Sequence, residues 1–361
     1  MHTRQRILIA PLDWGLGHAT RCIPIIRLLL KKNHEIIIAA DGRPLSLLKQ
    51  EFPQLEFIRL KGYGINYPKK GSMILKMFFS IPRILYGICA EHNSLKQLIK
   101  EKKIDVVVSD NRFGLWNKEI KSIFITHQLM IKSPFAEKML HKINLRYINK
   151  YDECWVPDVE GSTNLSGDLS RKYPLPKNAF FVGTLSRFSS HEPPPLLSSR
   201  RGDEGVRYDM MAIISGPEPQ RSVFERRLME QFIETNLKFL VVCGKTEEEK
   251  RVRIYDHITL ANYLSSEEIQ EAMQNSKIVI ARSGYSTIMD LATLGKKAIF
   301  IPTPGQTEQE YLAEELKQKK IAFFQKQSEL NLEQALIESE KYNGFETFSN
   351  SNELEKRIDL L

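Results

Sequence analysis

The stretch 278–311 constrains the fold of this chain more than any other part of it. Two short apolar runs, Ile278–Ala281 and Ala298–Pro302, alternate there with two helix starts, and polar residues gather where each run ends. Such runs are typical of buried parallel strands, and a Ser-Gly turn precedes the first helix. Ligands bind at the carboxyl ends of parallel strands, and helix starts attract anions. The stretch therefore predicts a site for a diphosphate joined to a ribose and a further polar group.

The same alternation of strands and helices runs along the rest of the chain. A proline- and serine-rich segment without periodicity, 186–206, interrupts it and is typical of a linker. Alternation of this kind predicts parallel sheets with right-handed crossovers, so we expect two α/β domains, 1–185 and 207–342. We expect the polar tail, 343–361, to form a helix that packs back on the N-terminal domain. The expected strands are Ile7–Ala10, Glu35–Ala40, Glu56–Leu60, Ile104–Ser109, Ser122–Thr126, Glu153–Pro157, Ala179–Val182, Asp209–Ile214, Lys238–Val242, Ile258–Leu260, Ile278–Ala281 and Ala298–Pro302.

Composition narrows the class of protein. The 361 residues, of which 42% are hydrophobic, are enough to bury the cores of two domains. No apolar run reaches about 18 residues without a charge, so we expect no transmembrane helix. The apolar run near the N-terminus leads into a glycine loop, which favours a first strand over a signal peptide. Four scattered cysteines indicate reduced thiols, and the eight histidines show no metal-binding spacing. These patterns predict a cytoplasmic protein without a metal site.

Positive charge is concentrated in the N-terminal half of the chain. Residues 61–150 hold 17 Lys and Arg against 6 Asp and Glu, whereas the whole chain has a net charge of +8. This excess indicates an anionic partner, such as a membrane surface, a phosphorylated acceptor or a nucleic acid. A solvated basic surface explains it equally well. Because no nucleic-acid-binding module is recognisable, we expect no nucleic acid as a partner.

An apolar segment, Met73–Ala90, lies inside this basic region. Lys76, Pro82 and Arg83 interrupt it, so it is too polar to span a bilayer. It suits a helix that inserts apolar side chains at a membrane interface, and the alternative is a buried helix pair of the N-terminal domain. Because the segment coincides with the basic excess, we expect a peripheral membrane contact through Lys69–Ala90.

A loop with two glycines follows the first strand. Gly15 and Gly17 let the backbone approach a ligand, and His18 stands where the next helix begins. A histidine at that place can take up a proton near neutral pH, so His18 is the expected general base. A purely structural turn is the alternative. A dinucleotide fingerprint would need a glycine where Thr20 stands, which makes an NAD-dependent oxidoreductase a distant alternative.

Three other strand exits carry candidate polar residues. Asp110 follows the strand expected at 104–109, and His127 follows the one at 122–126; both are secondary candidates for the general base. A structural turn at Asp110 and a merely positioned loop histidine at 127 are the alternatives. Ser215 and Gly216 form a turn before a helix and predict a loop that faces a phosphate or the acceptor. A proline-rich turn without a ligand is the alternative there.

With these motifs in this order, the chain resembles the MurG-like glycosyltransferases of family 28, which have the GT-B fold. The resemblance covers nearly the whole chain, and its most specific part begins at Arg282. It implies two Rossmann-like domains with parallel sheets that face a central cleft, the first binding the acceptor and the second the nucleotide sugar. The matching segments are Gly15–His18, Thr126–Gln128, Phe181–Arg187, Ser215–Gly216, Arg282–Gly284 with Asp290, and Gln309–Tyr311.

The resemblance also implies roles for individual residues. Asp13, Gly15 and Gly17 would form the acceptor-side loop. An aspartate at 290 and a glutamate at 310 stand where the family commonly has a glutamate and a glutamine. The nucleotide-sugar-binding set implied by the family comprises Ser283, Gly284, Ser286 and Thr287 at the diphosphate, Arg187 at the leaving phosphate, Asp290 at the ribose, Tyr263 and Leu264 at the uracil, Gln309 and Glu310 at the sugar, and Ser215, Gly216 and Arg282 beside them.

Together, the residues and the resemblance predict an inverting glycosyltransferase. It would move a hexose or N-acetylhexosamine from a UDP-sugar to a hydroxyl of a glycolipid or other lipid-linked cell-envelope acceptor, at the inner face of the cytoplasmic membrane. We expect no tightly bound cofactor, because a helix terminus and an arginine can stabilise the leaving diphosphate. The alternatives are a nucleotide-sugar hydrolase or epimerase on the same scaffold and a non-catalytic nucleotide-sugar-binding protein.

Overall fold

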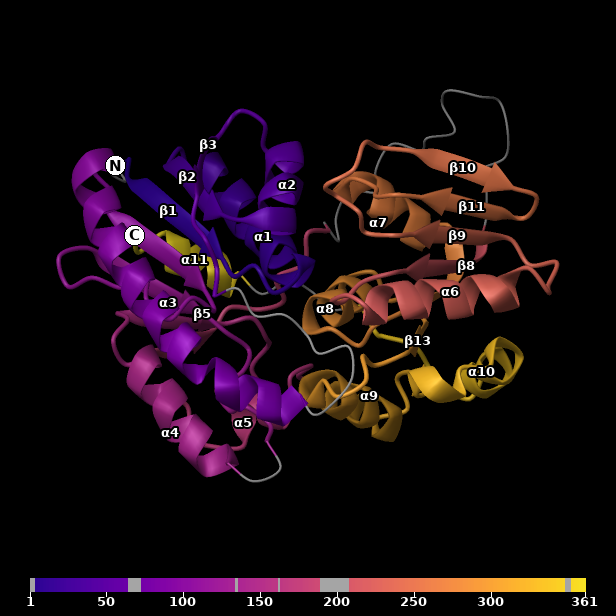
Figure 1. Ribbon diagram of the computed structural model, residues 1–361. Coiled ribbons are helices and arrows are strands. Elements are labelled where there is room, and N and C mark those ends of the chain that lie inside the picture. Colours follow the sequence, from indigo (N-terminus) through magenta and orange to yellow (C-terminus); the bar gives the residue numbers. More distant parts are fainter. Residues whose placement is uncertain (1–3, 64–72, 134–135, 162, 189–207, 348–351) are drawn as a thin grey trace. The chain divides into compact units, whose positions relative to one another are not determined.

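The computed structural model describes the chain except for residues 1–3, 64–72, 134–135, 162, 189–207 and 348–351, and except for the side chains of 73–79. The chain divides into two compact units. The N-terminal unit comprises Met1–Leu185 and Asn350–Leu361, and the C-terminal unit comprises Ser186–Ser349. Each unit is an α/β structure built around one seven-stranded sheet (Figure 1). The prediction of two domains with largely parallel sheets is confirmed.

The N-terminal unit holds a fully parallel sheet in the order β3-β2-β1-β4-β5-β6-β7. Its central strands are Ile- and Val-rich and buried along nearly their whole length, as strands covered on both faces must be. Its elements are β1 (Arg6–Pro11), α1 (Leu16–Lys31), β2 (Glu35–Ala40), α2 (Gly42–Glu51), β3 (Glu56–Arg59), α3 (Met73–Lys102), β4 (Val106–Asp110), β5 (Lys121–Ile125), α4 (Glu137–Ile148), β6 (Glu153–Val156), α5 (Asp168–Arg171), β7 (Ala179–Phe181) and α11 (Glu353–Ile358).

The register of this sheet brings three strand exits to the same level. Pro11 at the end of β1 pairs with Asp110 at the end of β4, and Asp110 pairs with Ile125 at the end of β5. Because the strands are parallel, the loops that follow them leave the same edge of the sheet. His18 at the start of α1, Asp110 at the end of β4 and His127 after β5 therefore lie at the same edge.

The end of the chain returns to the N-terminal unit. Lys32 Nζ lies 2.9 Å from Glu355 Oε1 and 2.7 Å from Asp359 Oδ1. The Arg357 guanidinium lies 3.6 Å from the centre of the Phe180 ring. These contacts hold α11 beside α1 and β7. Only six residues of the polar tail form this helix. Asn343–Phe345 instead donate backbone hydrogen bonds to the C-terminal unit.

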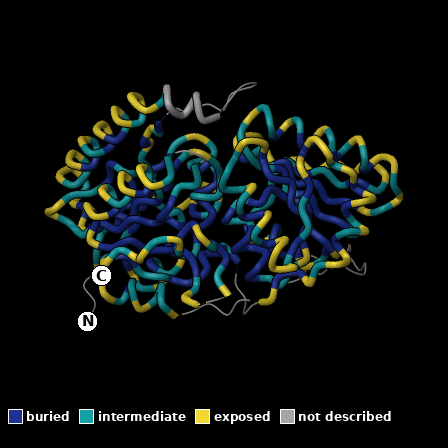
Figure 2. Tube along the Cα trace, turned by 90° about the horizontal axis from the view of Figure 1, so that it is seen from below, coloured by how far each residue is buried: buried dark blue, intermediate teal, exposed yellow. Residues whose placement is uncertain are grey.

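The C-terminal unit holds a sheet in the order β10-β11-β9-β8-β12-β13-β14, which is parallel except for the antiparallel pair β10 and β11. Its core lies between the sheet and helices such as α6 and α10. Figure 2 shows buried strands at the centre of each unit and more exposed helices around them. The elements are β8 (Tyr208–Ile213), α6 (Gln220–Phe232), β9 (Phe239–Val242), β10 (Val252–Tyr255), β11 (Ile258–Ala261), α7 (Ser266–Gln274), β12 (Ser276–Ala281), α8 (Tyr285–Thr293), β13 (Ala298–Phe300), α9 (Thr307–Gln318), β14 (Phe323–Phe324), a 3-10 helix (Gln327–Glu329) and α10 (Leu332–Ser339).

Two strands of this unit escaped the sequence prediction. Every residue of β10 is exposed, so the strand carries no alternation of buried and exposed side chains, and β14 has only two residues. The strands that were predicted meet as expected, since Ala281 at the end of β12 pairs with Ile213 of β8 and Phe300 of β13. The loops after β8, β12 and β13 therefore leave one edge of the sheet together.

The apolar segment after residue 72 forms one helix, α3, of 30 residues with Pro82 inside it. The segment is thus a single helix and not the helix pair of the alternative interpretation. The positions before Met73, including Lys69, lie outside the described residues. Within the described part of the chain, no helix has the length and apolar character needed to cross a membrane.

Candidate active site

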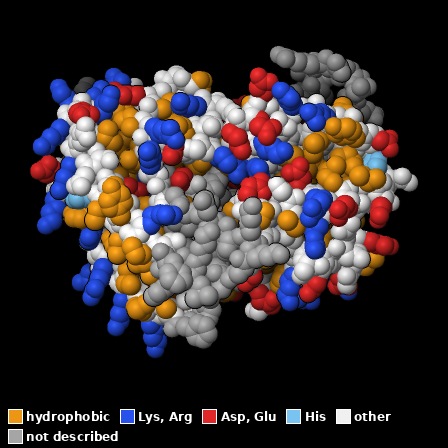
Figure 3. All heavy atoms as spheres, viewed as in Figure 1, with side chains coloured by type: hydrophobic (Ala, Val, Ile, Leu, Met, Phe, Trp, Pro, Cys, Tyr) orange, Lys and Arg blue, Asp and Glu red, His pale blue; other side chains and the backbone are white. Residues whose placement is uncertain are grey.

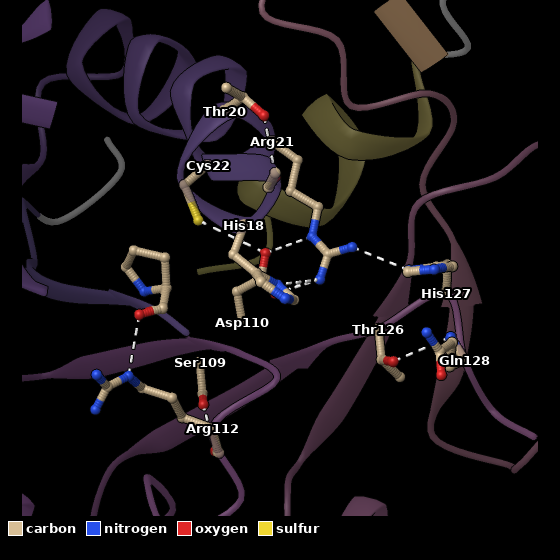
Figure 4. A network of polar contacts seen from close by, with 12 residues as sticks. His18, Thr20, Arg21, Cys22, Ser109, Asp110, Arg112, Thr126, His127 and Gln128 are labelled. Carbon is tan, nitrogen blue, oxygen red and sulfur yellow. Dashed lines mark hydrogen bonds and ion pairs between the residues drawn. The ribbon is translucent and has the colours of Figure 1, made fainter. Parts of the chain in front are cut away.

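Four side chains of the N-terminal unit form a buried polar group that we call the histidine cluster: His18, Arg21, Asp110 and His127 (Figure 4). His18 Nδ1 lies 2.7 Å from Asp110 Oδ1, and Arg21 Nε donates to Asp110 Oδ2 at 2.5 Å. Arg21 Nη2 also donates to Asp110 Oδ1, and Arg21 Nη1 lies 2.9 Å from His127 Nδ1. The structure thus brings together all three residues predicted as candidate bases.

Burial decides which members of the histidine cluster are accessible. Asp110 and Arg21 are 0% and 1% exposed, whereas the His18 side chain keeps 17% of its surface. Burial by itself raises the pKa of Asp110, but the Arg21 guanidinium and then His18 lower it to about 2. Asp110 is therefore an ionised carboxylate at neutral pH and is not itself a base there.

The acceptor-side loop, 12–17, joins β1 to α1 and lies against a second buried network. A Cβ on Gly62 would lie 1.9 Å from Asp13 Oδ1, so Asp13 packs directly on the Gly62 backbone. Trp14 is 36% exposed and its ring meets that of Tyr63 edge-on at 6.2 Å. Tyr63 in turn donates to Glu91 Oε2 at 2.9 Å. The loop that leads to His18 therefore rests on a surface held in place by these contacts.

The turn after Asp110 has a structural role in addition. Arg112 is fully buried, and its guanidinium donates to the carbonyls of Pro11, Leu60 and Lys61 and to Glu91 Oε1. Asn111 has a positive φ of 55°, which asparagine tolerates better than most residues. The predicted alternative of a structural turn thus describes Arg112, while Asp110 belongs to the histidine cluster.

In the C-terminal unit, Arg282 joins the three strand exits. It is 1% exposed and donates to the carbonyls of Ile301 and Pro302, to that of Gln220 and to Gln327 Oε1. Its guanidinium lies over the Phe224 ring at 4.2 Å. Burial lowers the pKa of Arg282 to about 9. Arg282 therefore holds the loops at this edge in place through most of its donors.

Two buried polar atoms near Gly216 are available to hydrogen-bond a ligand or a water. Among the described residues, Arg282 Nε and Thr303 Oγ1 have no hydrogen-bond partner. A Cβ on Gly216 would lie 3.5 Å from Thr303 Oγ1 and 3.9 Å from Arg282 Nε, so both atoms face the Gly216 α-carbon. The φ of Gly216 is +103°, which strongly favours glycine. Buried polar atoms need partners, so this small space suits a ligand oxygen or a water.

The residues at the start of α8 and α9 also lie at this edge. Gly284 is the residue before α8, and Ser286 and Thr287 lie in its first turn, half-buried. Ser283 is fully buried and donates from Oγ to the Gln309 carbonyl at 2.7 Å. Their contact with a diphosphate stays a prediction. Tyr263 and Leu264 are half-buried between β11 and α7, and their contact with a base stays a prediction too.

Gln309 and Glu310 brace a loop of their own unit. Gln309 Oε1 accepts from the Thr303 backbone N–H at 2.8 Å, and Glu310 Oε1 accepts from that of Gly305 at 3.0 Å. Each side chain thus holds the loop between β13 and α9. Ser215 and Gly216 lie in the loop after β8, near the same edge.

Asp290 is engaged by the segment that opens the C-terminal unit. Ser186 Oγ donates to Asp290 Oδ1 at 2.7 Å, and Arg187 Nε donates to Oδ2 at 3.1 Å. Asp290 is only 3% exposed, and burial raises its pKa against the lowering effect of Arg187 and Ser186. Asp290 and Arg187, which the family resemblance assigned to ribose and phosphate, are partners of each other in this structure.

We expect Asp290→Ala to lower the stability of the C-terminal unit by about 3 kcal/mol, because the change leaves the Arg187 guanidinium buried without its carboxylate. Ser186→Ala, which removes one hydrogen bond, is expected to cost about 1 kcal/mol. Thermal unfolding of both variants measures the difference. Equal melting temperatures for wild type and Asp290→Ala would contradict this anchoring role.

Sequence reasoning missed one member of the histidine cluster. Arg21 follows His18 by three residues, a spacing that places both side chains on one face of α1. An arginine in the apolar stretch of a helix near a predicted catalytic histidine was therefore a usable signal. Within the described part of the chain, no group of three or more His, Cys, Asp and Glu side chains is arranged to hold a metal ion.

Comparison with known proteins bears on both units. The model of the glycosyltransferase family 28 C-terminal domain matches residues 221–358, and that of glycosyl transferase family 1 matches residues 5–128. The UDP-N-acetylglucosamine--N-acetylmuramyl-(pentapeptide) pyrophosphoryl-undecaprenol N-acetylglucosamine transferase of Buchnera aphidicola is 27% identical over 337 residues, covering 90% of this chain and 85% of its own length. The chain is a glycosyltransferase, and it is similar to the MurG-like enzymes.

Other similar proteins agree with a glycosyltransferase of GT-B fold. An uncharacterised glycosyltransferase of Methanosarcina acetivorans is 24% identical over 323 residues, which is 85% of this chain and 82% of that protein. The crystal structure of the Acinetobacter baumannii MurG superposes with a TM-score of 0.54 at 13% identity, covering 99% of this chain and 98% of that one. The glycotransferase of kitacinnamycin gives a TM-score of 0.64 at 14% identity, with the same coverage of both chains. These two structures support the fold.

Proposed function

We propose that this glycosyltransferase moves a hexose or N-acetylhexosamine from a UDP-sugar to a hydroxyl of a lipid-linked acceptor, with inversion at the anomeric carbon. The observation that carries the proposal is the contact between His18 Nδ1 and Asp110 Oδ1 at 2.7 Å. An ionised, buried carboxylate that holds one ring nitrogen of a partly exposed histidine orients the other nitrogen as a base. The relative from Buchnera aphidicola is named for a UDP-sugar donor and an undecaprenol-linked acceptor, which supports the choice of substrates.

The proposed reaction is a direct displacement. His18 Nε2 takes the proton of the acceptor hydroxyl while its oxygen forms a bond to the anomeric carbon. The bond from that carbon to the diphosphate oxygen breaks, and UDP leaves with the electron pair. The base belongs to the N-terminal unit, whereas the residues proposed for the donor belong to the C-terminal unit.

The C-terminal unit offers donors of hydrogen bonds for the UDP-sugar. Arg282 Nε and Thr303 Oγ1 are buried and face Gly216, and the first turn of α8, which begins the helix with its backbone N–H groups, contains no acidic residue. Both features favour a phosphate oxygen. We propose the diphosphate there, with Tyr263 and Leu264 toward the uracil and Gln309 and Glu310 toward the sugar. No tightly bound cofactor is part of the proposal.

A panel of UDP-sugars tests the donor. The correct one is expected to raise the melting temperature of the purified protein and to release UDP when membrane lipid extract is added. If the protein releases free sugar at a comparable rate without lipid, it is a nucleotide-sugar hydrolase and not a transferase. If no UDP-sugar raises the melting temperature, the proposed donor class is wrong.

We also propose that the N-terminal unit contacts the inner face of the cytoplasmic membrane. On α3, Ile81, Leu85 and Tyr86 are 44%, 49% and 78% exposed, within the expected segment Lys69–Ala90. On α4, Met139 and Ile143 are 59% and 42% exposed. Figure 3 shows hydrophobic side chains beside lysine and arginine side chains over this part of the unit.

Helix α4 adds a feature that the sequence reasoning did not single out. Lys138, Lys142 and Arg146 are exposed and follow one another at a spacing of four residues, next to Met139 and Ile143. A helix surface with an apolar stripe beside a basic one suits the boundary between acyl chains and anionic headgroups. This combination supports membrane contact over a merely solvated basic surface.

The double change Met139→Asp with Ile143→Asp is expected to reduce binding to vesicles of anionic phospholipid about tenfold or more. It replaces two apolar side chains by carboxylates, which the anionic headgroups repel. Co-sedimentation with vesicles at low and high salt measures the loss. Ile337→Asp on α10 of the C-terminal unit, where Ile337 is 58% exposed, is the matched control and should bind like wild type. Undiminished binding of the α4 variant would remove α4 from the proposed membrane surface.

A further inference from the structure

We propose that Arg21 is a positioning residue that fixes His18 and His127 in opposite neutral tautomers, so that only His18 presents a lone pair at Nε2. The inference rests on the proposed role of His18 as the base. It concerns where the protons lie in the protein without substrate, so it can be tested whether or not the donor is a UDP-sugar.

The proton on His127 follows from its contact with Arg21. Arg21 Nη1 lies 2.9 Å from His127 Nδ1. A guanidinium has only donors and stays charged in proteins, so Nδ1 must accept. A neutral imidazole carries one ring proton, and that proton is then on His127 Nε2. His127 is only 3% exposed, and acquiring a second proton would turn its contact with Arg21 into a repulsion.

The proton on His18 follows from its contact with Asp110. His18 Nδ1 lies 2.7 Å from Asp110 Oδ1, and the carboxylate is ionised because Arg21 contacts both of its oxygens. Two lone pairs would repel at that distance, so a proton lies between the two atoms and belongs to Nδ1. Arg21 Nη2 also lies 2.8 Å from His18 Nδ1, but its proton goes to Asp110 Oδ1, because an ionised carboxylate oxygen is a stronger acceptor than an imidazole nitrogen and accepts from both donors. The lone pair of neutral His18 is therefore at Nε2.

Arg21 also changes the electrostatic surroundings of His18. An aspartate alone favours a doubly protonated histidine, which has no lone pair for a substrate proton. The side-on contact of Arg21 with Asp110 neutralises that carboxylate, and the guanidinium itself opposes a second positive charge beside it. Among the described residues, His18 contacts Asp110 and Arg21, while Cys22 contacts Asp110 and His127 contacts Arg21. A lysine has no planar fork and cannot make these contacts together.

The free protein labelled with ¹⁵N-histidine tests the inference directly. Long-range proton–nitrogen correlation spectra near neutral pH distinguish protonated from unprotonated ring nitrogens, and His18→Gln and His127→Gln assign the two rings. We expect His18 protonated at Nδ1 and His127 protonated at Nε2. The same tautomer in both rings, or a doubly protonated His18, would overturn the proposal.

Variants of Arg21 test its part in this arrangement. In Arg21→Met and Arg21→Lys we expect His127 to show a mixture of tautomers, because the guanidinium that makes its Nδ1 an acceptor is gone. Arg27→Met is the matched control, because Arg27 lies on the same helix and pairs with Glu51 outside the histidine cluster. Unchanged histidine spectra in a folded Arg21→Met protein would overturn the proposal. If the variants do not fold, the wild-type spectrum still decides it.

Discussion

Replacing His18 by alanine is expected to lower kcat for sugar transfer by a factor of about 100 to 10,000, the range typical for loss of a general base. The variant should fold, because Arg21 still compensates the buried charge of Asp110. Affinity for the nucleotide sugar is expected to stay within about twofold of wild type, since the proposed donor residues lie in the other unit. Steady-state kinetics and donor titration measure the two quantities.

A matched control for this prediction is His257→Ala in the C-terminal unit. The His257 side chain is 18% exposed, close to the 17% of His18, and its Nε2 lies 2.9 Å from the Phe232 carbonyl at the surface of its unit. Its replacement should leave kcat unchanged. A His18→Ala protein that transfers sugar at the wild-type rate would show that His18 is not the base, and a non-catalytic binding protein would then regain support.

Replacing Asp110 by asparagine is expected to affect both rate and stability. The amide cannot be an ionised partner for Arg21, which stays buried, so the N-terminal unit should lose about 3 to 5 kcal/mol of stability. His18 loses the carboxylate that orients it, and kcat should fall by about 100-fold or more. Urea unfolding at neutral pH and kinetics on the folded fraction measure these losses.

The pH dependence of this stability has a defined sign. The pKa of Asp110 in the folded protein is about 2, below its ordinary value of 3.8. The carboxylate therefore contributes its full stability above about pH 4 and loses it as the pH falls from about 4 toward 2. The difference in the free energy of unfolding between wild type and Asp110→Asn should therefore become smaller as the pH falls from about 4 toward 2. If this difference stays constant down to about pH 2, the pairing of Asp110 with Arg21 is contradicted.

Asp209→Asn serves as the control for burial. Asp209 is also paired, with Lys277 at 2.7 Å, and its side chain is 26% exposed while that of Lys277 is 75% exposed. Its pKa is lowered, first by the hydrogen bond from Lys277. An exposed pair contributes less than about 1 kcal/mol, so this variant should unfold nearly like wild type.

Most of the fold was predictable from local sequence. Twelve expected strands are present because each is a short apolar run between helical or turn segments, a pattern that directly reflects burial on both faces of a parallel sheet. The strands β10 and β14 were missed because an exposed edge strand and a two-residue strand leave no such pattern.

The candidate site was predictable in its location and less so in its partners. Strand exits are visible in the sequence, so His18, Asp110 and His127 could be expected at one edge of a sheet. Their joining by Arg21 depends on the register of β1, β4 and β5 and on the turn of α1 that faces them. That register is a property of the assembled sheet.

In the C-terminal unit the sequence by itself determined that the stretch 278–311 forms strand, turn, helix, strand and helix, because periodicity and turn residues act over a few neighbours. Only the tertiary structure decided that Asp290 pairs with Ser186 and Arg187. A buried charge or amide takes the partner that packing brings within about 3 Å, and residues a hundred positions apart become neighbours only when the whole sheet is formed.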